Sequence, residues 1–180
     1  MFFWKSLNQQ INRKNDAALL AAYAGTKISQ SMQKQSGVVG AFPGERKMSV
    51  APVNGAIVVC GVYNVLEHSG IWCDGEIIEL NGNGLVRPVS ANRFLQNRSG
   101  DTIFIAADDY GRPMGDEATM QRAVAQIYQY YDYHLLSCNC HHFTWHCVSG
   151  DDESLTLFSE LNHALSHYFE QAIHWHPLRH

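Results

Sequence analysis

The spacing of hydrophobic and polar residues changes near residue 56. Before it, residues 5–34 place isolated apolar positions in a polar background, which predicts one or two helices broken near Gly25. Residues 36–55 are rich in glycine and proline, so a loop or connecting arm is expected there. The first third of the chain is therefore predicted to be helix followed by loop, with a soft boundary inside the loop.

Beyond that loop, short apolar runs predict strands. Residues 56–60 are continuous and largely β-branched, as in a strand covered on both faces. Residues 67–72 and 76–80 flank an Asp-Gly pair, which is well suited to a two-residue hairpin turn. Residues 101–107 form another run of this kind. These runs predict an antiparallel sheet.

Helical patterns return in the last third of the chain. Residues 116–131 begin with an acidic pair and carry one apolar stripe, which predicts a helix. A second helix is expected from Asn139, a good N-cap residue, to Gly150, a natural C-terminal stop. Residues 154–175 have apolar positions at three- and four-residue steps and predict an amphipathic helix on the core. The histidine-rich end of the chain, residues 174–180, is expected to be an exposed tail.

Together these elements predict an α+β fold in which an antiparallel sheet packs against helices. We divide the chain into an N-terminal helical extension and loop of residues 1–52, a central domain of residues 53–150, and a C-terminal helix of residues 151–180 packed on that domain. A chain of 180 residues suits one domain and can bury a core without disulfide or metal staples.

Composition and charge narrow the classes of function. The formal net charge is −4, which argues against a nucleic-acid partner, because such a protein needs a basic face. The longest apolar runs are far shorter than the roughly 20 residues that cross a bilayer. Residues 1–4 are apolar but lack the order of a signal peptide, and the five cysteines are an odd number. We therefore expect a cytoplasmic protein without a transmembrane segment, and leave export by another route open.

The predicted hairpin places a histidine near a carboxylate. If the Asp-Gly pair forms the turn, one face of the hairpin carries His68, Gly70, Trp72, Ile77, Glu79 and Asn81. Glu79 is then the diagonal neighbour of His68, and Gly70 opposite it leaves room for the carboxylate. A carboxylate beside a histidine fixes its tautomer and stabilises the imidazolium. Two alternatives remain: Asn81 directly across from His68 as the partner, or Glu79 as a solvent-facing strand residue.

Cys140 is the candidate nucleophile. With Asn139 as N-cap it occupies the first turn of its helix, where the unpaired N–H groups and the helix dipole favour a thiolate. The same N–H groups could form an oxyanion hole. Phe143 and Cys147 share its helical face and are expected to anchor the helix on the sheet. A cysteine, a histidine and a carboxylate in these places predict acyl transfer through a thioester.

Two motifs resemble the lecithin:retinol acyltransferase (LRAT) family, in the circularly permuted branch of the NlpC-type papain-like superfamily. Residues 66–80 resemble its histidine hairpin, and residues 139–143 resemble its Asn-Cys-Glu-His-Phe motif, with His141 in place of the glutamate. The resemblance covers about residues 53–150. It implies a permuted papain-like fold with Cys140 as nucleophile, His68 as base and Glu79 as third member, a position that holds histidine in the vertebrate acyltransferases.

The resemblance implies a cysteine-dependent hydrolase or acyltransferase with a small-molecule acyl ester or amide as substrate, lipid-like in character. Peripheral membrane contact is compatible with such a substrate. The alternative within the wider superfamily is a peptide or isopeptide amidase acting on cell-wall or protein bonds. On either reading the enzyme needs no cofactor and no metal.

A non-enzymatic alternative is a zinc-binding or interaction module. His142 and His146 are four residues apart on a predicted helix, as are His163 and His167, and this spacing places two imidazoles on one helical face. No Cys-x-x-Cys pair is present, and a closed zinc site here would use the proposed nucleophile. Cys138 is either a resolving thiol or a bystander.

Overall fold

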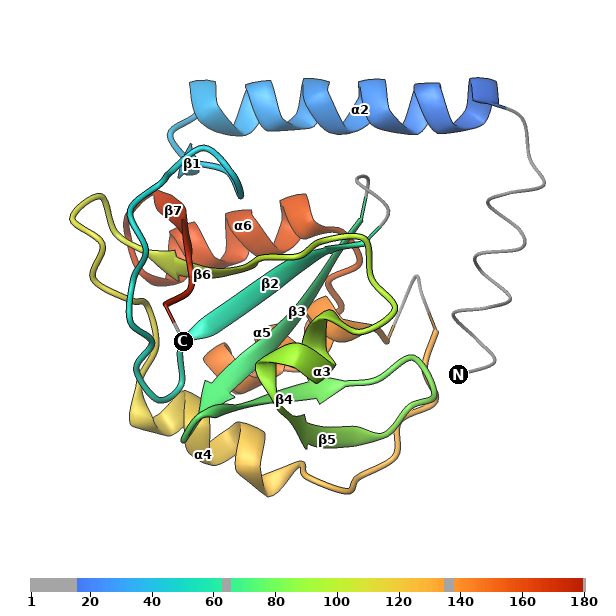
Figure 1. The fold of residues 1–180 in the computed structure, drawn as a ribbon, viewed down its shortest axis with the longest axis vertical. Coiled ribbons are helices and arrows are strands. Elements are labelled where there is room, and N and C mark those ends of the chain that lie inside the picture. Colours follow the sequence, from blue (N-terminus) through green and yellow to red (C-terminus); the bar gives the residue numbers. More distant parts are fainter. Residues whose placement is uncertain (1–15, 63–65, 135–137, 180) are drawn as a thin grey trace.

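The computed structural model describes residues 16–62, 66–134 and 138–179, which form a mixed seven-stranded sheet with helices packed on it (Figure 1). In chain order the elements are α2 (Asp16–Gln35), β1 (Val39–Ala41), β2 (Ile57–Val62), β3 (Leu66–Cys73), β4 (Glu76–Leu80), β5 (Val86–Val89), α3 (Ala91–Leu95), β6 (Ile103–Ala107), α4 (Glu117–Ala125), α5 (Cys140–Ser149), α6 (Phe158–Tyr168) and β7 (Ile173–Pro177). The α+β class predicted from the hydrophobic pattern is confirmed.

The strands lie in the order β1-β7-β6-β2-β3-β4-β5. Every pairing is antiparallel except the one between β1 and β7, which is parallel. The predicted antiparallel sheet is therefore mixed at one edge. It takes β1 from the predicted N-terminal segment and β7 from the predicted C-terminal segment, so a single sheet joins all three parts of the chain.

The hairpin of β3 and β4 has the predicted turn. Asp74 and Gly75 have φ values of 45° and 88°, the left-handed conformation that a two-residue turn of this type requires. Trp72 pairs with Ile77, and Cys73 pairs with Glu76. The register derived from the sequence is confirmed for the residues nearest the turn.

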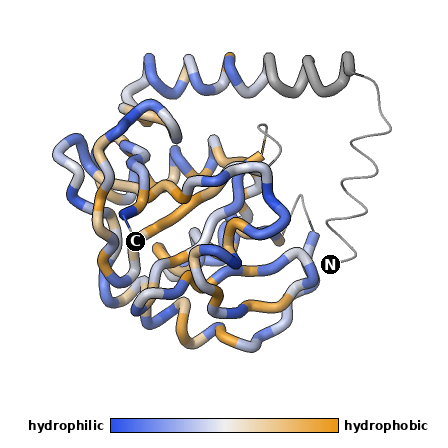
Figure 2. The backbone as a smooth tube through the Cα atoms, in the orientation of Figure 1, coloured by the Kyte–Doolittle hydropathy of each residue, from blue (hydrophilic) through white to orange (hydrophobic). Residues whose placement is uncertain are grey.

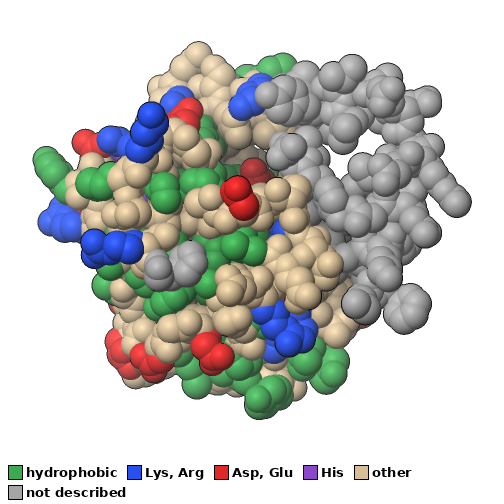
Figure 3. All heavy atoms as spheres, in the orientation of Figure 1, with side chains coloured by type: hydrophobic (Ala, Val, Ile, Leu, Met, Phe, Trp, Pro, Cys, Tyr) green, Lys and Arg blue, Asp and Glu red, His purple; other side chains and the backbone are tan. Residues whose placement is uncertain are grey.

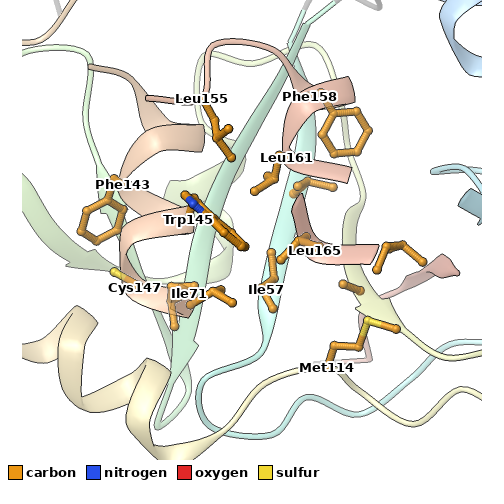
Figure 4. Close-up of a cluster of buried hydrophobic side chains, with 14 of the residues drawn as sticks. Ile57, Ile71, Met114, Phe143, Trp145, Cys147, Leu155, Phe158, Leu161 and Leu165 are labelled. Carbon is orange, nitrogen blue, oxygen red and sulfur yellow. The ribbon is translucent and has the colours of Figure 1, made fainter. Parts of the chain in front are cut away.

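Both faces of the central strands are buried. On one face, Ile57 of β2 and Ile71 of β3 contact side chains of α5 and α6, including Trp145 and Leu161 (Figure 4). The other face carries a second cluster that includes Phe94 of α3. Figure 2 shows the hydrophobic residues running along β2. This burial fixes the strand that carries His68 between two layers.

Helix α5 has the predicted limits. The side chain of Asn139 accepts hydrogen bonds from the N–H groups of His141 and His142, and Gly150 ends the helix with φ 82°. Arg122 of α4 donates from Nε and Nη2 to the last carbonyl groups of α5, each at 2.6 Å. Both ends of the helix that begins at Cys140 are therefore held by side chains.

Two predicted helices have different limits. Helix α2 continues through Gly25 without a break, and the part of the first prediction that covers residues 5–15 lies outside the described residues. Helix α4 ends at Ala125 instead of near residue 131. The following residues leave the helix because their backbone bonds to β5: Tyr128 N–H donates to Val86 O, and Val86 N–H donates to Gln129 O.

The C-terminal prediction was wrong in its second half. A helix is present only over Phe158–Tyr168, and the chain then enters the sheet as β7 between β1 and β6. His174, Trp175 and His176 are buried, although an exposed tail was expected. The Trp175 indole N–H donates to Asn162 Oδ1 at 3.0 Å, which ties the strand to α6. The sequence analysis also assigned no element to β1, β5 or α3.

No helix in the described part of the chain is long and apolar enough to cross a membrane. On the face seen in Figure 3, Lys and Arg side chains lie among Asp and Glu side chains and do not gather into one broad patch.

Candidate active site

The predicted pairing of His68 with Glu79 is present. Nε2 of His68 lies 2.8 Å from Oε2 of Glu79, and both side chains are buried, at 1% and 0% exposure. The solvent-facing alternative for Glu79 is therefore wrong. Asn81 instead donates to Asn83 Oδ1 at 2.9 Å, within the next turn.

Two arginines complete the surroundings of Glu79. Arg87 donates to Oε1 from Nε at 3.1 Å and from Nη2 at 2.9 Å, and Arg98 donates to Oε2 from Nη2 at 2.8 Å. Burial alone would raise the pKa of the Glu79 carboxyl, but the hydrogen bond and charge of His68 and the charge of Arg98 outweigh it and lower the pKa to about 2. Glu79 is therefore an ionised carboxylate at neutral pH.

A split in the sheet opens one edge of β3. β3 pairs with β2 over residues 66–71 but with β4 only over residues 71–73. Trp72 exchanges backbone hydrogen bonds with the segment that leads into β2. Since backbone polar groups alternate sides along a strand, those of Glu67 and Ser69 point toward β4, where the ladder does not extend.

The Cys140 thiol lies at this open edge. Its Sγ is 4.0 Å from the carbonyl oxygen of Glu67, and a hydrogen bond from the backbone of Ser69 also reaches it. The thiol thus takes a place in the ladder that a residue of β4 would otherwise fill. This position explains how a helix packed on one face of the sheet can bring its first residue to a histidine on the other face.

The thiol and the imidazole change each other's protonation. Burial raises the pKa of the Cys140 thiol, but the charge and hydrogen bond of His68, together with the hydrogen bond from Ser69, outweigh burial and lower the pKa overall. For His68, burial and the charge of Arg98 lower the pKa, while Cys140 and Glu79 raise it, and the net direction is upward. Because Nε2 is bound to Glu79, proton exchange with the thiol would use Nδ1. The pair therefore favours thiolate and imidazolium.

The first turn of α5 leaves one donor for an oxyanion. The Asn139 side chain accepts hydrogen bonds from the N–H groups of His141 and His142, and its backbone carbonyl accepts one from the Phe143 N–H. The Cys140 N–H is the donor of this turn that the cap does not take. An oxyanion hole built from several N–H groups of α5 was expected. The first turn of α5 offers one such donor, the Cys140 N–H.

Helix α3 closes the site from the other face. The centroids of the Phe94 and His68 rings lie 5.1 Å apart. The Arg98 guanidinium lies over the other ring of this pair, 4.9 Å from the centroid of Phe94. A side chain at Gly70 would collide with Ile77 and approach Phe94. The space at Gly70, expected to receive Glu79, is thus used by these apolar side chains.

A cavity of about 260 Å³ lies beside the site, between α2, β3 and the start of α6. Its walls are mostly apolar, with Phe42, Leu66 and Phe158 among them, and include Glu67 and His141, the chain neighbours of His68 and Cys140. Burial raises the pKa of Glu67 to about 7. Cys140 is only 6% exposed, and this cavity borders its chain neighbour His141.

Sequence reasoning missed several residues of the site. Arg87 directly opposes Glu79 across the β4–β5 hairpin, and a charge pair placed symmetrically around an Asn-Gly-rich turn was a usable signal. No pattern in the sequence links Arg98, Phe94 or Tyr133 to Glu79 or Cys140, because only the tertiary fold brings them to the site. Burial and, to a smaller extent, the charge of Cys140 raise the pKa of the Tyr133 hydroxyl.

The other cysteines, and the other histidines within residues 16–179, form no comparable site. Burial raises the pKa of the Cys60 and Cys147 thiols to about 12, and the pKa of Cys138 is also raised by burial. All five cysteines are free thiols. His146 faces Asp152 at 2.9 Å, and the described residues contain no group of three or more His, Cys, Asp or Glu arranged to hold a metal ion. The zinc alternative gains no support from this arrangement.

Comparisons of the chain with protein-family models, curated proteins and solved structures gave no match.

Proposed function

We propose that this chain is a cysteine-dependent hydrolase or acyltransferase of the LRAT-like kind, with a permuted papain-like arrangement, in which Cys140 is the nucleophile, His68 the base and Glu79 the group that orients the base. The observation that supports it best is the buried hydrogen bond between His68 and Glu79 beside the Cys140 thiol, whose protonation depends on that of His68. Cys140 and His68 lie seventy-two residues apart in the sequence, and the pKa values of thiol and imidazole move in opposite directions.

The reaction follows from these positions. The Cys140 thiolate attacks the acyl carbonyl carbon, and the Cys140 N–H donates to the oxygen that becomes negative. When the tetrahedral intermediate collapses, the bond to the leaving group breaks and the His68 imidazolium gives that group its proton. A water molecule or another acceptor then loses a proton to His68 and attacks the thioester, which releases the acyl product and the thiol. Glu79 holds the imidazole in one orientation throughout.

The cavity supports an acyl substrate. Its mostly apolar walls, including Phe42, Leu66 and Phe158, suit a hydrocarbon chain, and two further lining residues, Glu67 and His141, are the chain neighbours of His68 and Cys140. We therefore propose an ester or amide with an apolar acyl part. Hydrolysis of a series of 4-nitrophenyl esters of increasing acyl length tests this substrate class, with Cys140→Ser as the inactive control.

Selective alkylation tests the nucleophile. Iodoacetamide labelling of the whole chain across pH 5–9, read for each cysteine by peptide mass spectrometry, should modify Cys140 at lower pH than any other thiol. Its pKa lies below the ordinary value of 9.0, whereas those of Cys60, Cys73, Cys138 and Cys147 are raised. Only the thiolate reacts, so the labelling rate rises with the thiolate fraction as the pH increases. For Cys140 this rise should begin at a lower pH than for the other thiols, because its pKa is lower.

The His68→Ala variant should move the labelling profile of Cys140 upward in pH, because the imidazolium that stabilises the thiolate is gone. Ester hydrolysis should fall by about 10²- to 10⁴-fold, as expected for loss of a general base. Equal labelling of all five cysteines in the wild-type protein, or ester hydrolysis that survives Cys140→Ser, would overturn the proposal.

A further inference from the structure

Ser69 makes an unusual set of contacts with the helix of the nucleophile. Its hydroxyl lies 3.0 Å from the carbonyl oxygen of Cys140, 3.0 Å from Nδ1 of His141 and 2.9 Å from Oγ1 of Thr144. All three partners belong to the first turns of α5, whereas Ser69 belongs to β3. Ser69 and Thr144 are fully buried, and His141 is 5% exposed. Strand and helix are thus joined at this point by one hydroxyl.

The proton positions in this cluster can be assigned. A hydroxyl has one proton, and the Cys140 carbonyl can only accept, so Ser69 donates to it. Thr144 donates to Ser69 Oγ. The remaining partner, Nδ1 of His141, must then carry the proton and donate as well. Burial and the charge of His68 lower the pKa of His141 to about 3, so this ring is neutral and stays in that tautomer at neutral pH.

Ser69 also contacts the reacting atom. Its backbone N–H provides a hydrogen bond to the Cys140 sulfur, in the gap where β3 and β4 separate. One residue therefore holds the thiol, through Sγ, and the peptide group of the same cysteine, through its carbonyl oxygen. The residue is adjacent to His68, so it fixes the thiol relative to the strand that carries the base.

We propose that Ser69 is a positioning residue for Cys140, and that His141 and Thr144 hold its hydroxyl in the orientation that fixes the first turn of α5 against β3. The role rests on the proposed function, because it concerns the same nucleophile. It also gives His141, which stands where the resembling family has glutamate, a function as a neutral hydrogen-bond donor.

The charged and titratable groups around Cys140 also affect the pH profile of its labelling. His68 and Glu67 lie on β3, and the charge of Cys140 also acts on Cys60 of β2 and on Tyr133. Substitution of Ser69 removes none of these groups. A change in the labelling profile of Cys140 in that variant would therefore come from lost hydrogen bonds and altered position.

The test is the pH profile of Cys140 alkylation in Ser69→Ala, measured on the full chain with iodoacetamide. The apparent pKa of the thiol should rise by about one unit, which is a roughly tenfold slower labelling at pH values below the wild-type midpoint. Ser149→Ala is the matched control, because it removes a serine hydrogen bond to a backbone carbonyl, that of Trp145, at the far end of the same helix. That control should leave the profile unchanged.

The hydroxyl's own partners give a second line of test that keeps Ser69 in place. Thr144→Val and His141→Leu each remove one donor and should shift the profile in the same direction by a smaller amount. His141→Asn should restore it, because the asparagine amide N–H₂ occupies the place of the Nδ1 donor. If His141 had only a structural role, His141→Leu and His141→Asn would lose thermal stability alike, and the pH profiles of Cys140 labelling in the two variants would not differ.

The outcomes separate the two proposals. If wild-type Cys140 is labelled selectively but Ser69→Ala and His141→Leu match the wild-type profile, the positioning role is wrong and the proposed function stands. If wild-type Cys140 shows no selective labelling, the proposed function fails first and the positioning role with it. Thermal unfolding of each variant shows whether it is folded, and the Thr144→Val result decides the question if Ser69→Ala does not fold.

Discussion

At the scale of single residues, Glu79 holds the site together. It accepts hydrogen bonds from His68, Arg87 and Arg98 and has no exposed surface. Such a cluster places one negative charge among groups that carry up to three positive charges. The carboxylate therefore stabilises the fold and keeps His68 oriented, and both properties should respond when its charge is removed.

The Glu79→Gln variant should lose about 3–5 kcal/mol of unfolding free energy at pH 7, because it leaves buried cations without their counter-charge. The Glu79 pKa is lowered from its ordinary value of 4.5 to about 2, so its contribution is present above pH 4.5 and is lost as the pH falls toward 2. Urea unfolding at several pH values measures both effects.

Glu76→Gln is the matched control for this experiment, because Glu76 lies on the same strand with its side chain exposed. It should change the unfolding free energy by less than about 0.5 kcal/mol. Equal losses in the two variants would contradict the assignment of Glu79 as the charge centre of the site.

At the scale of elements, the site depends on the ends of α5. Asn139 and Ser69 hold its first turn, and Arg122 of α4 holds its last turn through two carbonyl groups. The helix is short, so its own hydrogen bonds leave a large share of backbone groups to be satisfied from outside. The neighbouring elements therefore fix where the helix begins, and with it the position of the thiol.

Arg122→Met should lower the unfolding free energy by about 2 kcal/mol, since it removes charged donors from two carbonyl groups while keeping an apolar stem. The pH profile of Cys140 labelling should not change, because the first turn keeps its contacts. Chemical denaturation and iodoacetamide labelling of the same samples measure the two effects. Arg93→Met, an exposed arginine of α3, serves as the control and should leave both unchanged; a shifted labelling profile in Arg122→Met would contradict the separate roles of the two helix ends.

At the scale of the whole molecule, the cavity is formed by parts of the chain that are far apart in the sequence. Helix α2 provides one wall, the start of β3 and α5 provide another, and the start of α6 closes it. Figure 1 shows α2 lying across the end of the molecule where these segments meet. The shape of this cavity is therefore a property of how α2 packs on the rest of the fold.

Ser29→Phe should fill the cavity and slow the labelling of Cys140 by bulky maleimides severalfold more than labelling by iodoacetamide, with a matching loss of activity on long-chain esters. Ser29 lines the cavity, whereas Ser31 on the same helix is exposed, and each accepts a hydrogen bond from the glutamine four residues later. Ser31→Phe is therefore a close control. Identical behaviour of the two variants would show that reactants reach Cys140 by another route.

The local elements that were predicted correctly are those whose signals are local. The Asp-Gly turn, the Asn139 cap and the Gly150 stop act within a few residues, so they identified the hairpin and the limits of α5. The diagonal placement of Glu79 beside His68 followed from the two-residue period of strands. The helix predicted over residues 154–175 forms only over Phe158–Tyr168, because the residues from Ile173 onward pair with β1 and β6 as strand β7.

The sequence by itself determined the α+β class, the register of the hairpin next to its turn and the three residues proposed for the chemistry, since each depends on periodicity or on a short motif. Only the tertiary structure decided where β3 and β4 separate, how Cys140 enters that gap, and that Arg87, Arg98 and Ser69 surround the pair. The physical reason is distance along the chain. Contacts between residues about seventy positions apart depend on how the sheet and helices pack, and no local pattern encodes that packing.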